Sequence, residues 1–327
     1  MKVHFEKLKE NLHSILRKVA FPDSEASQIA LIFTESTFDG VFSHGINRFP
    51  RFINDVKKGV VKPGILPEKV NELHAFEQWD GLKGAGISNA LLCSSRSIEL
   101  ASRYGIGCVG LRNTNHWMRG GTYGWKVAER GYLFMGWTNT LPNMPPWGGA
   151  SAALGNNPFV LAIPHPEKPI VLDMAMSQYA YGKLEWHVRN GTDLPDYGGY
   201  NSKNQLTRKP AEILETGRIL PTGMWKGSSL ALVLDLAAAI LSGGNTTREI
   251  GELTDETSLS QVFIAVDVKK YISADQLRNL VDETLAYMGD QNENARYPGQ
   301  SSMEKRHVHL ENGVEIPEEL WNEIRNL

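Results

Sequence analysis

Apolar positions at helical spacing dominate the first sixty residues of the chain. They recur every three or four residues over 5–19 and again over 23–40, where Asp23 or Ser24 can cap a helix. Pro50 suits the first turn of a third helix, which we expect to end near residue 59. The pattern therefore predicts a helical N-terminal region with a break between two helices at residues 43–48.

Shorter apolar runs predict strands after this region, one or two of them between residues 66 and 79. Further strands are expected at 107–111, 133–137, 159–163, 170–173 and 261–268. Helices are expected at 86–105, 125–131, 226–243, 274–288 and 317–327. The run 226–243 is so apolar that we expect it at the centre of the fold. Strands alternating with helices predict a layered α/β core.

Two long segments lack this periodicity. Residues 141–158 are rich in Pro, Gly and Asn and predict a long ordered loop, a kind of segment that is usually functional. Residues 189–209 are polar and predict an exposed loop. We divide the chain into a helical N-terminal region (1–65), an α/β core (66–290) and a C-terminal segment (291–327) that returns to the N-terminal region.

Composition places the chain among globular proteins and favours a small molecule as ligand. The 327 residues are 41% hydrophobic and 22% charged, with a formal net charge of -3. Because no long basic run stands out, nucleic acid and anionic membranes are not expected as partners. The two cysteines, Cys93 and Cys108, provide no disulfide framework and fit a reducing compartment. The first residues lack a signal-peptide core and no long uninterrupted apolar window occurs, so we expect a cytoplasmic protein.

The stretch from Phe42 to Arg51 is the first candidate for chemistry. It places the imidazole of His44 and the guanidinium of Arg48 about one helical turn apart, at the predicted break. Reaction at a carbon next to a carboxylate needs such groups, a proton donor or acceptor near neutral pH and a planar cation. The sequence is also compatible with His44 capping a helix end and with Arg48 as a surface cation.

A second candidate lies in the polar turn after the strand 107–111. His116 and Asn115 occupy this turn, and α/β folds gather functional groups at the ends of buried strands. The alternative for His116 is a hydrogen-bonded structural histidine. His307 and His309 lie in a polar tail without a third ligand, so no metal site is predicted.

The usual dinucleotide fingerprint is absent from the sequence. Residues 84–89 carry only the first two glycines of GxGxxG and do not follow a convincing strand. Residues 223–229 place backbone N–H groups and the ammonium of Lys226 at a helix N-terminus, which favours an anion. A solvent-exposed capping lysine is the alternative. HExxH, GxSxG and a cysteine nucleophile in a recognisable setting are also missing from the sequence.

Six motifs occur in one order along almost the whole chain. They are Ser43-His44-Gly45, Arg112-Asn113-Thr114-Asn115-His116, Pro146-Trp147-Gly148-Gly149, Gly155-Asn156-Asn157-Pro158, Asp173-Met174-Ala175 and Pro221-Thr222-Gly223-Met224-Trp225-Lys226-Gly227. With this set the chain resembles the type-2 malate/L-lactate dehydrogenase family of nicotinamide-dependent 2-oxo acid reductases. Residues 42–45 followed by 47–52, and residues 115–121, resemble its 2,3-diketo-L-gulonate reductase subgroup.

The resemblance implies a homodimer with a non-Rossmann α/β fold, in which helices flank a mixed, largely antiparallel sheet and a helical part stands at the N-terminus. It implies NADH, with NADPH as the alternative, and a 2-oxo acid substrate. His44 would be the proton donor. From their type and position, we expect Arg48 to hold the substrate carboxylate and His116 or Asn115 to orient the oxygen. Rival functions are reduction of another 2-oxo acid, a cofactor-free lyase or hydrolase using His44 and His116, and a non-catalytic binding protein.

Three segments would contact the cofactor by this resemblance. They are Pro169, Ile170, Val171, Leu172, Asp173, Met174 and Ala175; Trp225 and Lys226; and Gly299, Gln300 and Ser301. The chain departs from the family at Gln300-Ser301, where relatives carry an acidic residue. It departs again at Trp117-Met118, in the same direction as the diketogulonate subgroup.

Overall fold

The structure is a computed structural model that describes residues 1–292 and 294–327. The N-terminal part consists of α1 (Phe5–Lys18), α2 (Asp23–Phe38) and α3 (Phe49–Lys57), which bury their apolar faces against one another. The predicted helices are confirmed here, but the predicted cap is wrong. Pro22 occupies the N-cap of α2 and no side chain caps this helix end.

The break between α2 and α3 contains two short 3-10 turns, η1 (Phe42–His44) and η2 (Ile46–Arg48). His44 therefore ends one turn and Arg48 ends the next.

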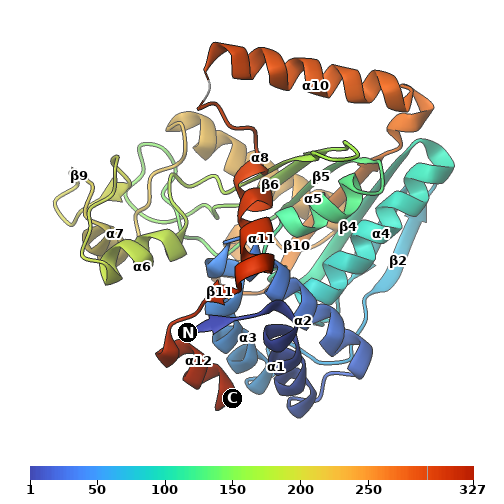
Figure 1. The fold of residues 1–327 in the computed structure, drawn as a ribbon. Helices are drawn as coiled ribbons and strands as arrows, with labels where there is room; N and C mark the ends of the chain where they lie inside the picture. Colours follow the sequence, from blue (N-terminus) through green and yellow to red (C-terminus); the bar gives the residue numbers. More distant parts are fainter. Residues whose placement is uncertain (293) are drawn as a thin grey trace.

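A seven-stranded sheet forms the core of the described chain, with strand order β2-β3-β4-β10-β5-β6-β7 (Figure 1). Only the β3–β4 pairing is parallel, and the other pairings in this sheet are antiparallel. The strands are β2 (Glu68–Leu73), β3 (Phe76–Asp80), β4 (Ile106–Asn115), β5 (Leu133–Thr138), β6 (Phe159–Ile163), β7 (Ile170–Met174) and β10 (Thr257–Val266). The expected mixed, largely antiparallel sheet is confirmed. Because β4 has only one parallel neighbour, β3, and both neighbours of β5 are antiparallel, the sheet contains no run of parallel strands of the nucleotide-binding kind.

Helices cover both faces of this sheet. Side chains along a strand alternate between the faces, and β10 sends Phe263 toward α4 (Gly86–Tyr104) and α5 (Gly121–Ala128). The neighbouring Val262 packs toward α8 (Trp225–Ser242) on the opposite face. The core therefore has two apolar layers.

The expectation that residues 226–243 lie at the centre of the fold is wrong. α8 covers the sheet mainly with small residues such as Ala231 and Ala238, while Val233 and Ile240 stay 59% and 74% exposed. This helix is long and apolar enough to cross a membrane by length and composition, but only 33% of it is buried in the fold. An apolar helix can therefore lie on one face of a sheet and still present a large apolar surface.

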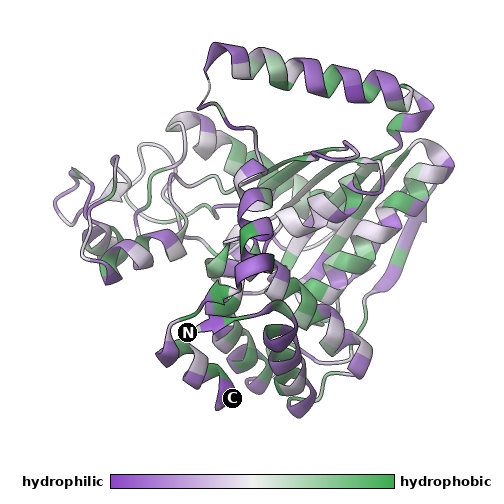
Figure 2. Ribbon diagram, in the orientation of Figure 1, coloured by the Kyte–Doolittle hydropathy of each residue, from purple (hydrophilic) through white to green (hydrophobic). Residues whose placement is uncertain are grey.

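Several elements between β7 and the C-terminus were not expected from the sequence. They are α6 (Tyr181–Arg189), β8 (Gly199–Tyr200), β9 (Leu206–Thr207), α7 (Pro210–Thr216), α9 (Thr247–Gly251), η3 (Val268–Lys270) and α11 (Gln300–Asn312). Hydropathy explains the absence of a signal, since α11 buries none of its residues and is mostly hydrophilic in Figure 2. α6 likewise buries only Leu184.

The two ends of the chain meet on the N-terminal helices (Figure 1). β1 (Lys2–Val3) pairs with β11 (Val314–Glu315), and α12 (Glu318–Arg325) packs on α3. α10 (Ala274–Gln291) buries only Val281 and runs along the far end of the molecule. The C-terminal residues thus lie beside the turns that carry His44 and Arg48.

Candidate active site

The position of His44 is fixed by Thr37, near the C-terminal end of α2. The Thr37 hydroxyl donates to the carbonyl of Phe33 (2.7 Å) and accepts from the N–H of Ile46 (2.9 Å). A Cβ atom on Gly45 would lie 2.5 Å from the same hydroxyl, so only glycine allows this approach. The close contact holds the turn that presents His44.

His44 and His116 lie face to face although 72 residues separate them. Their ring centroids are 5.8 Å apart with an interplanar angle of 21°. His116 directly follows β4, and its Nδ1 accepts a hydrogen bond from the N–H of Met118 (2.9 Å). Since that nitrogen is an acceptor, the proton of a neutral His116 lies on Nε2, which remains a donor. Ser43 Oγ lies 3.0 Å from Nδ1 of His44.

Both imidazoles are only partly accessible to solvent, and their surroundings disfavour the charged form. Burial, then Arg48 and Arg119, lowers the pKa of His44 to about 4. Burial, then Arg48, His44 and Arg51, lowers the pKa of His116 well below its ordinary value. Both rings are therefore neutral at neutral pH in the free protein, and the protonated His44 expected from the sequence is not its resting form.

Arg48 adjoins this pair and faces one carboxylate. Its Nη2 lies 3.4 Å from Oε2 of Glu256, and Nη2 of Arg51 lies 3.6 Å from the same oxygen. These single contacts are longer than the forked pairs that Arg makes with carboxylates, which leaves donors of Arg48 available. Burial and the neighbouring Arg51 lower the pKa of Arg48.

Asn115 has a structural role that limits its expected part in substrate binding. Its Nδ2 donates to the carbonyls of Lys83 and Gly84, both at 2.9 Å, and of Val60 at 3.2 Å. Its Oδ1 is buried and has no hydrogen-bond partner among the described residues. The amide thus ties the end of β4 to the loops before α4, which positions the adjacent His116.

The segments expected to contact a cofactor adjoin one another along β7. The N–H of Val171 donates to the carbonyl of Pro298 (3.0 Å), so the turn before Gln300 lies against the start of this strand. Beyond the strand's other end, the N–H of Thr222 donates to the carbonyl of Met176 (2.8 Å), which brings the start of α8 alongside. Lys226 at that start is exposed.

The carboxylate of Asp173 accepts a hydrogen bond from within the protein, although this residue is exposed. Its carboxylate accepts from the N–H of Gly121 at the start of α5 (2.7 Å). Desolvation raises the pKa of this carboxyl, while Arg119 and the Gly121 N–H act in the opposite direction. Asp173 thus links β7 to α5.

Sequence reasoning missed a buried ion network beside the site. Asp39, which is 1% exposed, pairs with Arg119 and accepts from Nε (2.5 Å) and Nη2 (2.8 Å) of Arg306. Arg119 also donates to Ser302 Oγ (3.1 Å) in α11. The network joins the end of α2, the turn after β4 and α11. Its only sequence signal is an arginine between Met118 and two glycines.

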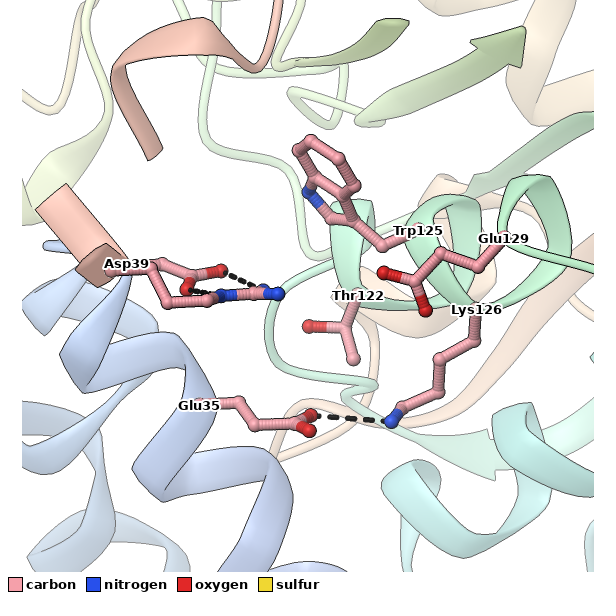
Figure 3. A pocket seen from close by; sticks show the side chains of 7 residues that line it. Glu35, Asp39, Thr122, Trp125, Lys126 and Glu129 are labelled. Atoms are coloured by element: carbon pink, nitrogen blue, oxygen red, sulfur yellow. Dashed lines mark hydrogen bonds and ion pairs between the residues drawn. The ribbon is translucent and has the colours of Figure 1, made fainter. Parts of the chain in front are cut away.

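Figure 3 shows the small pocket beside this network. Asp39, Thr122 and Trp125 surround it, and Glu35 forms an ion pair with Lys126 (3.2 Å) at its edge. Most of the charged side chains in its lining are paired with one another, Glu35 with Lys126 and Asp39 with Arg306. Among the described residues there is also no group of three His, Cys, Asp or Glu side chains that could hold a metal ion.

The segment between β7 and α8 approaches the histidine turn. Gly182 in α6 lies so near that a Cβ atom there would come 2.7 Å from the Cβ of Ser43. Tyr181 donates from its hydroxyl to the carbonyl of Asn143 in the long loop 141–158 (3.2 Å). The loop predicted to be functional is therefore connected to the helix beside His44.

Comparison with curated proteins and solved structures agrees with this architecture. The chain is 42% identical over 334 aligned positions to the 2,3-diketo-L-gulonate reductases of Salmonella typhimurium and Citrobacter koseri, covering 100% of both chains in each case. The sulfolactate dehydrogenase of Methanocaldococcus jannaschii is 28% identical with a TM-score of 0.90, covering 99% of this chain and 95% of that one. The malate dehydrogenase of Entamoeba histolytica shares the fold, with 24% identity, a TM-score of 0.93 and coverage of 100% and 96%.

A sequence model of the malate/L-lactate dehydrogenase family matches residues 3–325. Dehydrogenases of this kind act on CH–OH groups, which implies a nicotinamide cofactor. The chain belongs to the malate/L-lactate dehydrogenase family and is an oxidoreductase.

Proposed function

We propose that the protein reduces the C2 carbonyl of 2,3-diketo-L-gulonate to 3-dehydro-L-gulonate with NADH, and that His44 donates the proton. The observation that carries this proposal is the stacked pair of His44 and His116 with the guanidinium of Arg48 beside it. The full-length relatives of that name support the choice of substrate.

Each group has a role that follows from its chemistry. Arg48 holds the substrate carboxylate, because its contact with Glu256 occupies only one of the guanidinium nitrogens and leaves the others free to donate. His116 donates from Nε2 to a substrate oxygen and polarises the carbonyl. His44 gives its proton to the oxygen as negative charge develops there. Asn115 holds the adjacent His116 in position, because its side chain donates hydrogen bonds to the backbone carbonyls of Lys83 and Gly84.

Substrate binding raises the pKa of His44, so that this residue can take up the proton that it later donates. A cation lowers the pKa of a neighbouring imidazole, and Arg48 has this effect in the free protein. A bound carboxylate offsets the guanidinium charge and moves the pKa of His44 back upward. Proton uptake therefore accompanies binding of the 2-oxo acid anion, and His44 becomes an acid only when substrate is present.

The three segments around β7 fit a dinucleotide. Gly299 has φ +95° and lies against the ring of Trp125, while Trp225 and Lys226 are exposed at the N-terminus of α8. A helix N-terminus with an ammonium suits a phosphate, and an exposed indole suits a flat ring. Residues 169–175, 225–226 and 299–301 would hold the cofactor. When bound, the nicotinamide supplies the hydride.

We propose a homodimer that forms through α8. This helix exposes large apolar side chains in a row, and a surface of this kind marks an interface. The members are Leu232, Val233, Leu236 and Ile240. A cytoplasmic location and a role in carbohydrate catabolism accord with the two free cysteines and with the proposed substrate.

A substrate panel with NADH and with NADPH tests the proposal. The panel contains 2,3-diketo-L-gulonate, pyruvate, oxaloacetate, and the oxo forms of sulfolactate and ureidoglycolate, which cover the alternative 2-oxo acid reductases. We expect the highest kcat/KM with 2,3-diketo-L-gulonate and NADH. A higher value for another acid reassigns the substrate. No turnover together with no thermal shift from either cofactor favours a cofactor-free enzyme.

A further inference from the structure

We infer that Glu256 sets the charge of the substrate that this site accepts, by offsetting one of the two positive charges of Arg48 and Arg51 and so excluding 2-oxo dicarboxylates. The inference rests on the proposed function, because it concerns the carboxylate site of the same reductase. It assigns a specificity role to a residue outside every motif that the sequence pattern singled out.

Strand register places Glu256 beside the histidine pair. Thr257 opens β10 and pairs with Asn115, the last residue of β4, while His116 follows immediately. Glu256 thus lies directly before β10, next to the end of β4, where His116 follows. Its side chain is 13% exposed, so it forms part of the wall of the site and not of the outer surface.

The Glu256 carboxylate meets two cations at once. Arg48 ends η2 and Arg51 lies three residues further on in the first turn of α3, so both guanidinium groups lie on one side of the helix. Both reach the same Oε2 atom, at 3.4 and 3.6 Å. One carboxylate shared by two guanidinium groups leaves one positive charge for a ligand.

Neighbouring acids strengthen this selection. Asp55 of α3 and Glu185 of α6 lie close enough to raise the pKa of Arg48, although neither forms an ion pair with it among the described residues. A substrate with a single carboxylate can use Arg48, whereas a second carboxylate would meet the Glu256 carboxylate beside Arg51 and further negative charge nearby. The polyhydroxylated chain of a sugar acid carries no such charge.

The loop that carries Glu256 also provides a matched control. Asp255 pairs with Lys58 at the end of α3 (3.8 Å), and both of these side chains are over a third exposed. Asp255→Asn therefore removes the same charge one residue away without touching the two arginines. Glu256→Gln keeps the shape of the side chain and removes its charge.

The experiment compares kcat/KM for oxaloacetate, a dianion, with kcat/KM for pyruvate, a monoanion, at fixed NADH. We expect E256Q to raise the oxaloacetate-to-pyruvate ratio at least tenfold, because the negative charge that repels the second carboxylate is lost and both arginines keep their full positive charge. D255N should change the ratio less than twofold. A ratio in E256Q that stays within twofold of wild type, or that moves equally in D255N, overturns the inference.

Two further arms keep the result interpretable. The double variant R51Q/E256Q removes both charges and should return the ratio to within threefold of wild type, even if E256Q alone folds poorly; a tenfold rise that persists in it contradicts the inference. If wild-type protein reduces neither acid, the proposed function fails while the charge selection is still measurable. In that case, calorimetric titration with malonate and oxamate tests the charge selection. A malonate-to-oxamate affinity ratio that is unchanged in E256Q overturns the inference, and a tenfold rise in this ratio upholds it.

Discussion

The pH dependence of the two reaction directions is the most discriminating consequence of the site. Reduction of a carbonyl consumes a proton, so the apparent equilibrium constant changes about tenfold per pH unit. The ratio of kcat/KM for reduction to kcat/KM for oxidation must change by the same factor. The pKa of His44 in the free protein decides how the two kcat/KM values share this change. With this pKa at about 4, the whole change falls on the reduction direction above that pH.

The magnitude follows directly from titration of one group. Above its pKa of about 4, the protonated fraction of His44 falls about tenfold per pH unit, so kcat/KM for reduction should fall roughly 100-fold between pH 6 and pH 8. Oxidation of the hydroxy acid needs neutral His44, so its kcat/KM should stay constant over that range. The constant direction serves as the internal control for enzyme integrity.

The assay follows NADH absorbance in both directions from pH 5.5 to 8.5 in buffers of constant ionic strength, because surface electrostatics depend on salt. A reduction rate that stays level from pH 5.5 to 7 and bends near neutral pH refutes the reasoning, because it would mean that Arg48 and burial do not depress the pKa of His44. A bend near neutral pH in the oxidation direction would carry the same meaning.

Three further predictions concern binding, stability and assembly. Arg48→Gln should raise KM for the 2-oxo acid roughly 10- to 100-fold with KM for NADH unchanged, since one charge-assisted hydrogen bond contributes about 1.5–3 kcal/mol; equal changes in both KM values would contradict it. Asp39→Ala should lower the free energy of unfolding by about 3–5 kcal/mol, because it leaves Arg119 buried without its partner. Denaturant titration measures this loss, and Glu252→Gln, which breaks the exposed ion pair with Arg248, should cost less than about 1 kcal/mol. Ile240→Lys should convert the proposed dimer to a monomer in light scattering and leave the thermal stability similar, because this side chain is 74% exposed; a wild-type monomer would contradict the proposed interface.

The elements that could be predicted from the sequence are those whose buried side chains give a regular pattern of apolar residues. α1 shows apolar residues at regular helical spacing, and the second half of β10, residues 262–266, is a continuous apolar run. α11 buries no residue and gives no such trace, which is why it was missed. The misplacement of α8 has a related cause, because hydropathy indicates how apolar a helix is but not which partner covers it.

The site could be predicted only where its parts are close in sequence. His44 and Arg48 lie in one stretch, so their proximity was foreseeable. The contact between Arg48 and Glu256 spans 208 residues and depends on the register of β10 with β4, which no local pattern encodes. The pairing of His44 with His116 has the same origin. Motif order along the chain provided this information indirectly, through the family.

The proposed proton transfer from His44 to 2,3-diketo-L-gulonate is tested by one comparison of wild type with His44→Asn. It measures the single-turnover rate of NADH oxidation by this acid, with NADH affinity determined by fluorescence titration. We expect His44→Asn to lose roughly 100- to 10,000-fold in rate with NADH binding intact. A rate in the variant within tenfold of wild type would mean that His44 is not the proton donor.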